Sequence, residues 1–427
     1  MNPATPKTEP PPSTPFRKAV FGGSLTAKRN LLLVAAFAAI LMLAAASGQE
    51  QPKPPFATAK PAPKVAAGRP AAQSADVRQA TAVVIQRLVA IDNVCAWPNL
   101  TVLRDGTIIA MIFNRPNHGL EAGDIDCWAS TDGGRTWKKR GTPGPHEPET
   151  NRIHVAAGLA GNGDLIAITG GWSNRYPSES TPAFANSKSP DGSRLPFRFE
   201  LVPTWVARSS DGGFTWSIDK RSFPALGPNG VACTPFGNIQ TAADGSLCVA
   251  VYNRPMPALR AFVYRSRDDG KTWGEPVALD EKVSRNETAL LHLGDGQWLA
   301  AARSYGPHGI YLYRSTDDAR SWQQSAPLTA TAQYPAHLLK LRDGRLLLSY
   351  GNRVASQFGV VAMTSADNGV TWSNPITVVR DLTSGDCGYP ASVQLPGGEI
   401  LTAYYAGGVV SHQRYHMGTV IWKPPAK

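Results

Sequence analysis

The feature that most constrains the fold is a short motif, Ser-x-Asp-x-Gly-x-Thr-Trp, which recurs through the chain. Four copies keep every feature, and a fifth, STDDARSW, has Ala319 in place of the glycine and Ser321 in place of the threonine. The copies lie at 130–137, 209–216, 266–273, 315–322 and 365–372. Such repetition indicates an array of similar supersecondary units.

The residue types in the motif predict a tight turn between two strands. Asp and Ser side chains accept hydrogen bonds from nearby backbone N–H groups, and glycine supplies a positive φ. The tryptophan packs between layers and gives each copy a small core of its own. We therefore expect a structural role for the motif and assign no chemistry to it.

A second pattern precedes each copy: an apolar strand, a turn containing glycine and another apolar strand, which together predict a hairpin. The six hairpin turns lie at Asp105-Gly106, Asn162-Gly163, Asp244-Gly245, Asp295-Gly296, Asp343-Gly344 and Gly397-Gly398. A hairpin followed by a third strand, the Asp motif and a fourth strand makes one blade of a β-propeller.

The sixth hairpin has no Asp motif after it. Residues 414–422 can supply its third strand and residues 81–90 its fourth, and this pairing of the two ends of the domain would close the ring and remove free strand edges. The sequence therefore predicts an all-β fold, a six-bladed β-propeller over residues 79–424.

The segment before the propeller predicts export. Residues 1–47 combine a basic stretch with the apolar run 31–47, which ends in small residues, as is typical of a secretory signal. The run also reaches the lower length limit of a membrane span, so an uncleaved anchor is the alternative. Residues 48–78 are rich in Pro and Ala and predict an extended linker. Either way, we expect the propeller to be periplasmic or extracellular.

The net charge of +11 does not indicate a nucleic-acid partner. Residues 1–90 hold 11 basic and 3 acidic side chains, whereas the rest of the chain holds 32 basic and 29 acidic ones. Binding to a duplex needs clustered positive charge on the folded domain. We therefore expect no nucleic acid among the partners, and we expect a monomer.

The five cysteines decide little about the fold. An exported protein permits disulfides, but an odd number leaves at least one thiol free. Cys127 and Cys248 fall within predicted strands, where a small buried thiol is expected.

The blade geometry predicts where chemistry can lie. The hairpin turns and Asp motifs share one end of each blade, so functional loops are expected at the other end, just before the first strand or just after the second strand of a hairpin. Polar and aromatic side chains at these positions include Trp97, Asp124, Arg152, Glu287, Arg303, Arg353 and Tyr389. Such groups converging on a propeller axis suit a sugar-like ligand. No His or Cys spacing indicates a metal, and no cofactor is expected.

The Asp motifs and six hairpins together resemble the sialidase (neuraminidase) superfamily of Asp-box, or BNR-repeat, propellers, over about residues 81–422. The resemblance implies a glycan substrate and a retaining glycoside hydrolase. It further implies a tyrosine nucleophile with a glutamate beside it, an aspartate acid/base, and three arginines that hold the substrate carboxylate.

Four residues match the family's pattern. Segment 287–303 resembles the family segment in which a glutamate precedes one strand and an arginine ends the next, which implies Glu287 as the base and Arg303 as a carboxylate ligand. Arg353 resembles a second arginine of the triad. The stretch GYPASVQL resembles the segment around the nucleophile and implies that role for Tyr389.

The chain departs from the family at the first hairpin. Ala96 stands where the family has the first arginine, directly before Trp97, which we expect to contact the substrate. Arg115 and Arg152 are alternative sources of the missing guanidinium, and we assign Arg152 to substrate binding. Losing one arginine would weaken recognition of a sialic acid by about 1.5–3 kcal/mol, which is enough to allow another sugar.

The acid/base is expected in the loop before the first Asp motif. This loop offers His118, Glu121, Asp124 and Asp126, of which Asp126 is expected to begin a strand. Glu121 and Asp124 remain as the carboxyl groups, and we select Asp124.

The sequence thus predicts an exported, exo-acting glycoside hydrolase that removes a terminal acidic sugar. Two alternatives stay open. One is a propeller hydrolase or lyase that acts on a different sugar, which Ala96 favours. The other is a non-catalytic propeller that binds carbohydrate or another surface.

Overall fold

The computed structural model describes residues 80–174, 200–253, 259–304, 306–424 and 426. They belong to one unit, Ala75–Lys427. Within these ranges the regular elements are β-strands, and no helix has the length and hydropathy needed to cross a membrane. The predicted signal or anchor, 1–47, and the predicted linker, 48–78, lie outside the described residues.

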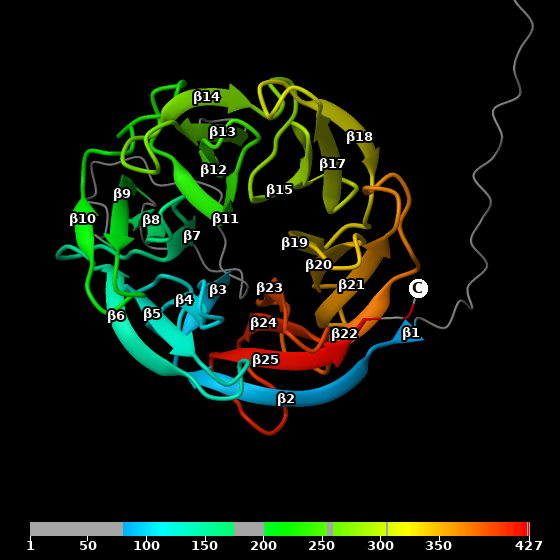
Figure 1. Cartoon of the computed structure of the whole chain (residues 1–427). Coiled ribbons are helices and arrows are strands. Elements are labelled where there is room, and N and C mark those ends of the chain that lie inside the picture. The colour runs from blue at the N-terminus through cyan, green and yellow to red at the C-terminus, as the bar shows by residue number, and fades with distance from the viewer. Residues whose placement is uncertain (1–79, 175–199, 254–258, 305, 425, 427) are drawn as a thin grey trace, which may run out of the picture. The chain divides into compact units, whose positions relative to one another are not determined.

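The described strands form six units of four that follow one another around a ring (Figure 1). The second and third units are joined into one eight-stranded sheet by the parallel pairing of β7 (His154–Leu159) with β11 (Thr234–Thr241). The first two units contain β3 (Cys95–Val102), β4 (Ile108–Phe113), β5 (Ile125–Ser130) and β6 (Lys138–Gly144), then β7 (His154–Leu159), β8 (Leu165–Trp172), β9 (Leu201–Ser209) and β10 (Ser217–Asp219). The next two contain β11 (Thr234–Thr241), β12 (Leu247–Asn253), β13 (Arg260–Ser266) and β14 (Gly274–Ala278), then β15 (Thr288–Gly294), β16 (Gln297–Arg303), β17 (Ile310–Ser315) and β18 (Gln323–Pro327). The last two contain β19 (Gln333–Lys340), β20 (Leu346–Asn352), β21 (Gly359–Ser365) and β22 (Ile376–Arg380), then β23 (Cys387–Gln394), β24 (Ile400–Ala406), β25 (His416–Lys423) and β2 (Val83–Asp92).

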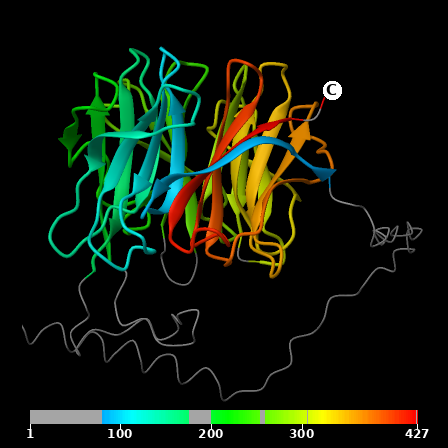
Figure 2. The ribbon, with the colours of Figure 1, turned by 90° about the horizontal axis from the view of Figure 1, so that it is seen from below.

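The ring closes between the two ends of the domain. β2 pairs antiparallel with β25, and Figure 2 shows the blue β2 lying along the red β25. The short β1 (Ala80–Thr81) adds a parallel pair with β22. The all-β fold and the predicted pairing of the first long strand with the last strand are therefore confirmed.

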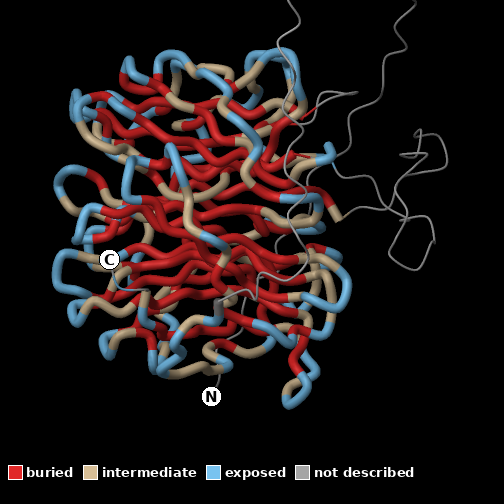
Figure 3. Tube along the Cα trace, turned by 90° about the vertical axis from the view of Figure 1, so that its right-hand side faces the viewer, coloured by how far each residue is buried: buried red, intermediate tan, exposed pale blue. Residues whose placement is uncertain are grey.

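The first strand of each unit lies innermost, and these six strands surround the axis (Figure 1). Apolar side chains pack between neighbouring units, as Leu100 and Ile108 of the first do against Val393 and Leu401 of the last. Figure 3 shows the strands buried and the connecting loops exposed. The core is therefore a series of contacts between adjacent sheets, and it leaves both sets of loops free at the surface.

Each Asp motif forms the expected turn. In the first copy, Thr136 Oγ1 donates to Asp132 Oδ2 (2.6 Å), and the Gly134 N–H donates to Ser130 Oγ (2.8 Å). The divergent copy at 315–322, which has Ala319 and Ser321 in place of the glycine and the threonine, keeps the same hydrogen bonds around Asp317. The motif is a structural turn, as predicted.

The motif turns and the hairpin turns lie at the same end of the sheets. Asp269, in the third motif, accepts a hydrogen bond from the Gly161 N–H in the hairpin turn of the preceding unit (2.5 Å). Asp318 and Ala243 make the equivalent contact one unit further on (3.1 Å). The loops at the opposite end are therefore the ones left for function.

All five cysteines are buried and free in the structure, so the disulfides that export would permit are not formed. Burial raises the pKa of the Cys127 thiol to about 12.

The motif carboxylates predict acid sensitivity. Hydrogen bonds from Thr371 and Ser365 lower the pKa of Asp367 to about 2. In Asp132, burial alone would raise the pKa, but bonds from Thr136 and Ser130 lower it to about 2. A carboxyl group whose pKa is lower in the folded state contributes stability above its unfolded pKa, and this contribution is lost as the pH falls through the folded pKa.

We therefore expect the melting temperature to fall as the pH drops from about 4 to about 2. Asp367→Asn removes one such carboxylate, so this variant should be less stable at pH 7 and should lose less stability on acidification. Thermal unfolding followed by circular dichroism from pH 2 to pH 7 measures both effects. Parallel curves for the variant and the parent would contradict this role of the motif.

Candidate active site

Three buried side chains meet at the loop end opposite the Asp motifs. Glu287 directly precedes β15, Arg303 ends β16, and Tyr389 lies in β23. Tyr389 Oη donates to Glu287 Oε1 (2.5 Å). Arg303 Nη1 donates to Glu287 Oε2 (2.6 Å) and to Tyr389 Oη (3.0 Å). The structure thus brings together a phenol, a carboxylate and a guanidinium that are far apart in the sequence.

The surroundings keep the Tyr389 phenol neutral at rest. Burial and the adjacent Glu287 carboxylate raise the pKa of Tyr389 well above its ordinary value, and the charges of Arg303 and Arg353 offset only part of this. Glu287 Oε1 accepts the hydrogen bond of this phenol, so its carboxylate is positioned to accept the phenolic proton. The short bond between the two groups provides that path.

The inner strands are distorted where they reach this end. The pairing of β23 with β24 shifts register between Gly388 and Ala391, and the first strand pair shifts between Cys95 and Asn99. Tyr389 has φ 49°, which is uncommon for a residue other than glycine. A bulge of this kind turns a side chain away from the regular alternation of the strand. The same kind of distortion occurs in β11 and β19.

A second arginine lies beside the nucleophile candidate. Arg353 follows β20, and its guanidinium lies 4.9 Å from the centre of the Tyr389 ring. Its Nη2 donates to Tyr405 Oη (3.4 Å), and its Nε donates to a backbone carbonyl oxygen (3.0 Å). The Tyr334 ring lies 4.0 Å from the Arg303 guanidinium and 5.8 Å from that of Arg353. Two cations are therefore held around one aromatic ring next to Tyr389.

Trp97 stacks on the central tyrosine. Its ring lies 5.1 Å from that of Tyr389, with an angle of 29° between the planes, and 4.5 Å from that of His154. Trp97 and Tyr389 also line a small cavity of about 30 Å³ between the inner strands. Glu287 and Arg303 do not line this cavity.

Arg152 is not brought to this cluster. It is fully buried, its Nη1 donates to the Pro203 carbonyl oxygen (2.6 Å), and its guanidinium lies 3.4 Å from the Trp205 ring. Burial lowers the pKa of Arg152 to about 10. Ala96, where the resemblance expects an arginine, is buried with φ 47°.

Asp124 is held by its own neighbours. Its Oδ1 accepts from the His146 N–H (2.8 Å) and pairs with His146 Nδ1 (2.5 Å), and its Oδ2 accepts from Asn114 (3.1 Å). Burial would raise the pKa of Asp124, but the bonds from His146 outweigh it and lower the pKa. None of its contacts among the described residues is with Glu287 or Tyr389. Glu121 lies exposed in the same loop.

The sequence assigned no role to a second network at this end. His118 Nδ1 pairs with Asp386 Oδ1 (3.2 Å), and that carboxylate also accepts bonds from the hydroxyl groups of Tyr405 (2.5 Å) and Tyr415. Asp386 lies three residues before Tyr389, and His118 lies in the loop searched for the acid/base. Their positions in the sequence were the only indications of a role for these two residues. Their contact becomes visible only when the ring is closed.

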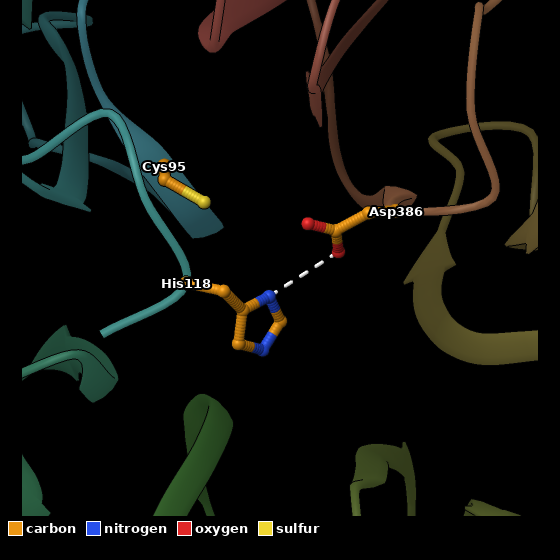
Figure 4. Close-up of side chains that lie close together, drawn as sticks. All are labelled: Cys95, His118 and Asp386. Atoms are coloured by element: carbon orange, nitrogen blue, oxygen red, sulfur yellow. Dashed lines mark hydrogen bonds and ion pairs between the residues drawn. The ribbon is translucent and has the colours of Figure 1, made fainter. Parts of the chain in front are cut away.

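Cys95 adds a thiol to this network, and its sulfur lies within 4.8 Å of the ligand atoms of His118 and Asp386 (Figure 4). Burial raises the pKa of the Cys95 thiol well above its ordinary value. Both oxygens of Asp386 already accept hydrogen bonds. This donor set suits a protonated network better than a cation site, because a metal needs a thiolate and free carboxylate lone pairs.

The ring of four-stranded sheets, with Asp motifs at one end and a tyrosine–glutamate–arginine cluster at the other, defines a sialidase-like propeller. Residues 192–401 match the family model of the BNR repeat-like domain. This segment is therefore similar to the BNR repeat-like domain, and the chain is distantly similar to sialidases.

Two curated relatives are both sialidases. The chain is 25% identical to a sialidase of Micromonospora viridifaciens over 351 residues, which is 75% of this chain and 51% of the relative. It is 25% identical to a sialidase of Bacteroides fragilis over 226 residues, which is 44% of this chain and 40% of the relative. The chain therefore spans about half the length, or less, of the curated relatives it matches.

Solved structures share the fold. A protein of unknown function from Dyadobacter fermentans aligns with a TM-score of 0.63 at 24% identity, covering 82% of this chain and 99% of that one. A Hadza microbial sialidase aligns with a TM-score of 0.56 at 19% identity, covering 76% and 65%. A NanB sialidase from Streptococcus pneumoniae aligns with a TM-score of 0.59 at 13% identity, covering 79% and 70%.

Proposed function

We propose that this protein is an exported, exo-acting glycoside hydrolase of the sialidase type, with a six-bladed propeller at 79–424 and an export segment at 1–47. It removes a terminal acidic sugar from a glycan and works as a monomer without a cofactor. The observation that carries the proposal is the hydrogen-bonded cluster of Tyr389, Glu287 and Arg303.

The first half of the reaction forms a bond to the tyrosine. Glu287 takes the phenolic proton while Tyr389 Oη attacks the anomeric carbon, and the glycosidic bond breaks with its electron pair going to the leaving oxygen, which a general acid protonates. In the second half, water attacks the same carbon and gives a proton to the conjugate base of that acid, while the tyrosine leaves and takes its proton back from Glu287. Two displacements retain the anomeric configuration. A phenol suits an anionic substrate, because a carboxylate nucleophile would meet charge repulsion.

Arg303 and Arg353 are the proposed ligands of the sugar's carboxylate, since guanidinium groups bind carboxylates through paired, charge-assisted hydrogen bonds. Trp97 contributes an aromatic surface beside Tyr389. Ala96 supplies no positive charge where the family has a third arginine. Arg152 donates to the Pro203 carbonyl oxygen and does not take that place. This favours the second candidate, a related propeller hydrolase or lyase that acts on another acidic or neutral sugar.

A panel of fluorogenic glycosides tests the proposal. It contains an α-sialoside, a uronide and neutral sugars, each offered to the wild-type protein and to Tyr389→Phe. We expect acidic glycosides to be turned over at least about tenfold better than neutral ones. This factor corresponds to the lower end, about 1.5 kcal/mol, of the contribution of one hydrogen bond to a charged group. Preference for the uronide would support the second candidate. Glycan binding without turnover of any member would contradict the enzyme and favour a carbohydrate-binding propeller.

A further inference from the structure

His118 and Tyr389 lie against the same two aromatic rings. The imidazole meets Trp97 edge-on at 5.3 Å between ring centres and lies 6.5 Å from the Tyr405 ring. The Tyr389 ring lies 5.1 Å from Trp97 and 5.7 Å from Tyr405. His118 is 39% exposed at its side chain, whereas Tyr389 is 5% exposed. His118 is therefore positioned beside the nucleophile and open to a ligand.

The carboxylate of Asp386 fixes the orientation of this imidazole (Figure 4). Burial would raise the pKa of Asp386, but the bonds from His118, Tyr405 and Tyr415 hold it well below its ordinary value, so the group is ionised. An ionised carboxylate only accepts hydrogen bonds, so Nδ1 of His118 carries the proton in this pair. Nε2 is then the nitrogen that can exchange a proton with a ligand.

The loop is also held rigidly at the next residue. The carbonyl oxygen of Gly119 accepts hydrogen bonds from Trp172 Nε1 (2.9 Å), Asn151 Nδ2 (3.0 Å) and Asn174 Nδ2 (2.8 Å). Gly119 has φ 71°, and a Cβ there would lie 2.3 Å from the Trp172 ring. Three donors on one carbonyl oxygen, and a position that only glycine fits, fix the backbone that carries His118.

We infer that His118 is the general acid and base of the proposed reaction, with Asp386 as its positioning residue. Nε2–H gives its proton to the leaving oxygen as the glycosidic bond breaks. The neutral imidazole then takes a proton from the attacking water as the bond to Tyr389 breaks. Each turnover returns both His118 and Glu287 to their starting states. The inference rests on the proposed function, and it replaces Asp124, whose carboxylate is bound to His146.

Two substrates with the same acidic sugar test the inference: an aryl glycoside, whose leaving group needs little protonation, and an alkyl-linked or natural glycan, whose leaving group needs it. We expect His118→Ala and His118→Gln to lose about 10²- to 10⁴-fold in kcat/KM on the second substrate and less than about tenfold on the first, because kcat/KM reports the half-reaction in which the leaving group departs. A merely structural role would lower both values together. His412→Ala is the matched control, because His412 also pairs with a carboxylate, Asp92 (2.8 Å), but contacts neither Trp97 nor Tyr389 among the described residues; its rates should stay unchanged.

Asp386→Asn adds a second readout. The Asp386 carboxylate holds the imidazole in place. Its loss should therefore lower kcat/KM more on the alkyl-linked substrate than on the aryl glycoside, whereas a merely structural role would lower both values together.

The outcomes are distinguishable. Turnover by the wild-type protein that is lost in Tyr389→Phe supports the proposed function, independently of the kinetics of the His118 variants. Equal loss of kcat/KM on both substrates in the His118 variants would overturn the inference alone, as would a leaving-group effect found in Asp124→Asn instead. Loss of wild-type activity to a metal chelator would also overturn it, since His118 would then be a ligand. An inactive wild-type protein would overturn the function and the inference together.

Discussion

Tyr389→Phe is expected to lower kcat on an acidic glycoside by at least about a thousandfold, as is usual when a residue of a catalytic unit is removed. The phenylalanine ring keeps the stacking on Trp97, and Glu287 keeps its ion pair with Arg303 (2.6 Å). The free energy of unfolding should therefore change little. Steady-state kinetics and urea unfolding of the same preparation separate the two effects.

Tyr313→Phe is the matched control for this prediction. Tyr313 is also a buried tyrosine whose hydroxyl contacts a carboxylate, that of Asp280 (3.0 Å), but it lies in β17, away from the inner strands. Its variant should lose stability and keep kcat. A Tyr389→Phe protein within tenfold of the parent would exclude the tyrosine as nucleophile.

Arg303→Met is expected to lower the free energy of unfolding by about 3–5 kcal/mol, because it leaves the buried Glu287 carboxylate without its ion-pair partner. Both side chains of the pair are less than a tenth exposed. The same variant loses one proposed ligand of the sugar's carboxylate, so KM for an acidic glycoside should rise as well. Urea unfolding monitored by tryptophan fluorescence measures the first effect.

A double-mutant cycle identifies the cause. Glu287→Gln removes the charge that Arg303→Met leaves unpaired, so the double variant should be more stable than the sum of the two single changes implies. Additive losses would show that Arg303 stabilises the fold through packing on Tyr334 and not through the buried ion pair.

Much of the fold could be predicted from local sequence. The Asp motifs encode their own turns, since Ser130, Asp132 and Thr136 satisfy one another within seven residues. The hairpins likewise depend on alternating side chains and a glycine in the turn. The closure of the ring followed from counting strands, because the last hairpin lacked a fourth strand and 81–90 was left unassigned.

The residues of the candidate site could be predicted only in part. Glu287, Arg303 and Tyr389 were predicted because their spacing follows the family's pattern, and the structure joins them by hydrogen bonds. Asp124 was selected by residue type and position in a loop, but which carboxylate is free depends on neighbours such as His146.

The pair of His118 and Asp386 could not be found in this way. The two residues are 268 positions apart, and they meet only because the first and last sheets are adjacent in the ring. Arg152 was proposed as a replacement for the missing arginine because it lies just before the first strand of the second hairpin, on the predicted functional face. Its burial under Trp205 depends on packing that no local pattern encodes.

The pairing of β2 with β25 has a consequence for how the molecule is made. The strand that completes the last sheet is synthesised first, and it must wait unpaired until more than 320 later residues are available. Apart from the short β1, the other sheets consist of segments that follow one another in the sequence and can form in order, so we expect closure of the ring to be the slowest step of folding. Proteolysis or truncation at either end would therefore open the sheet that carries Tyr389, and with it the proposed catalytic cluster.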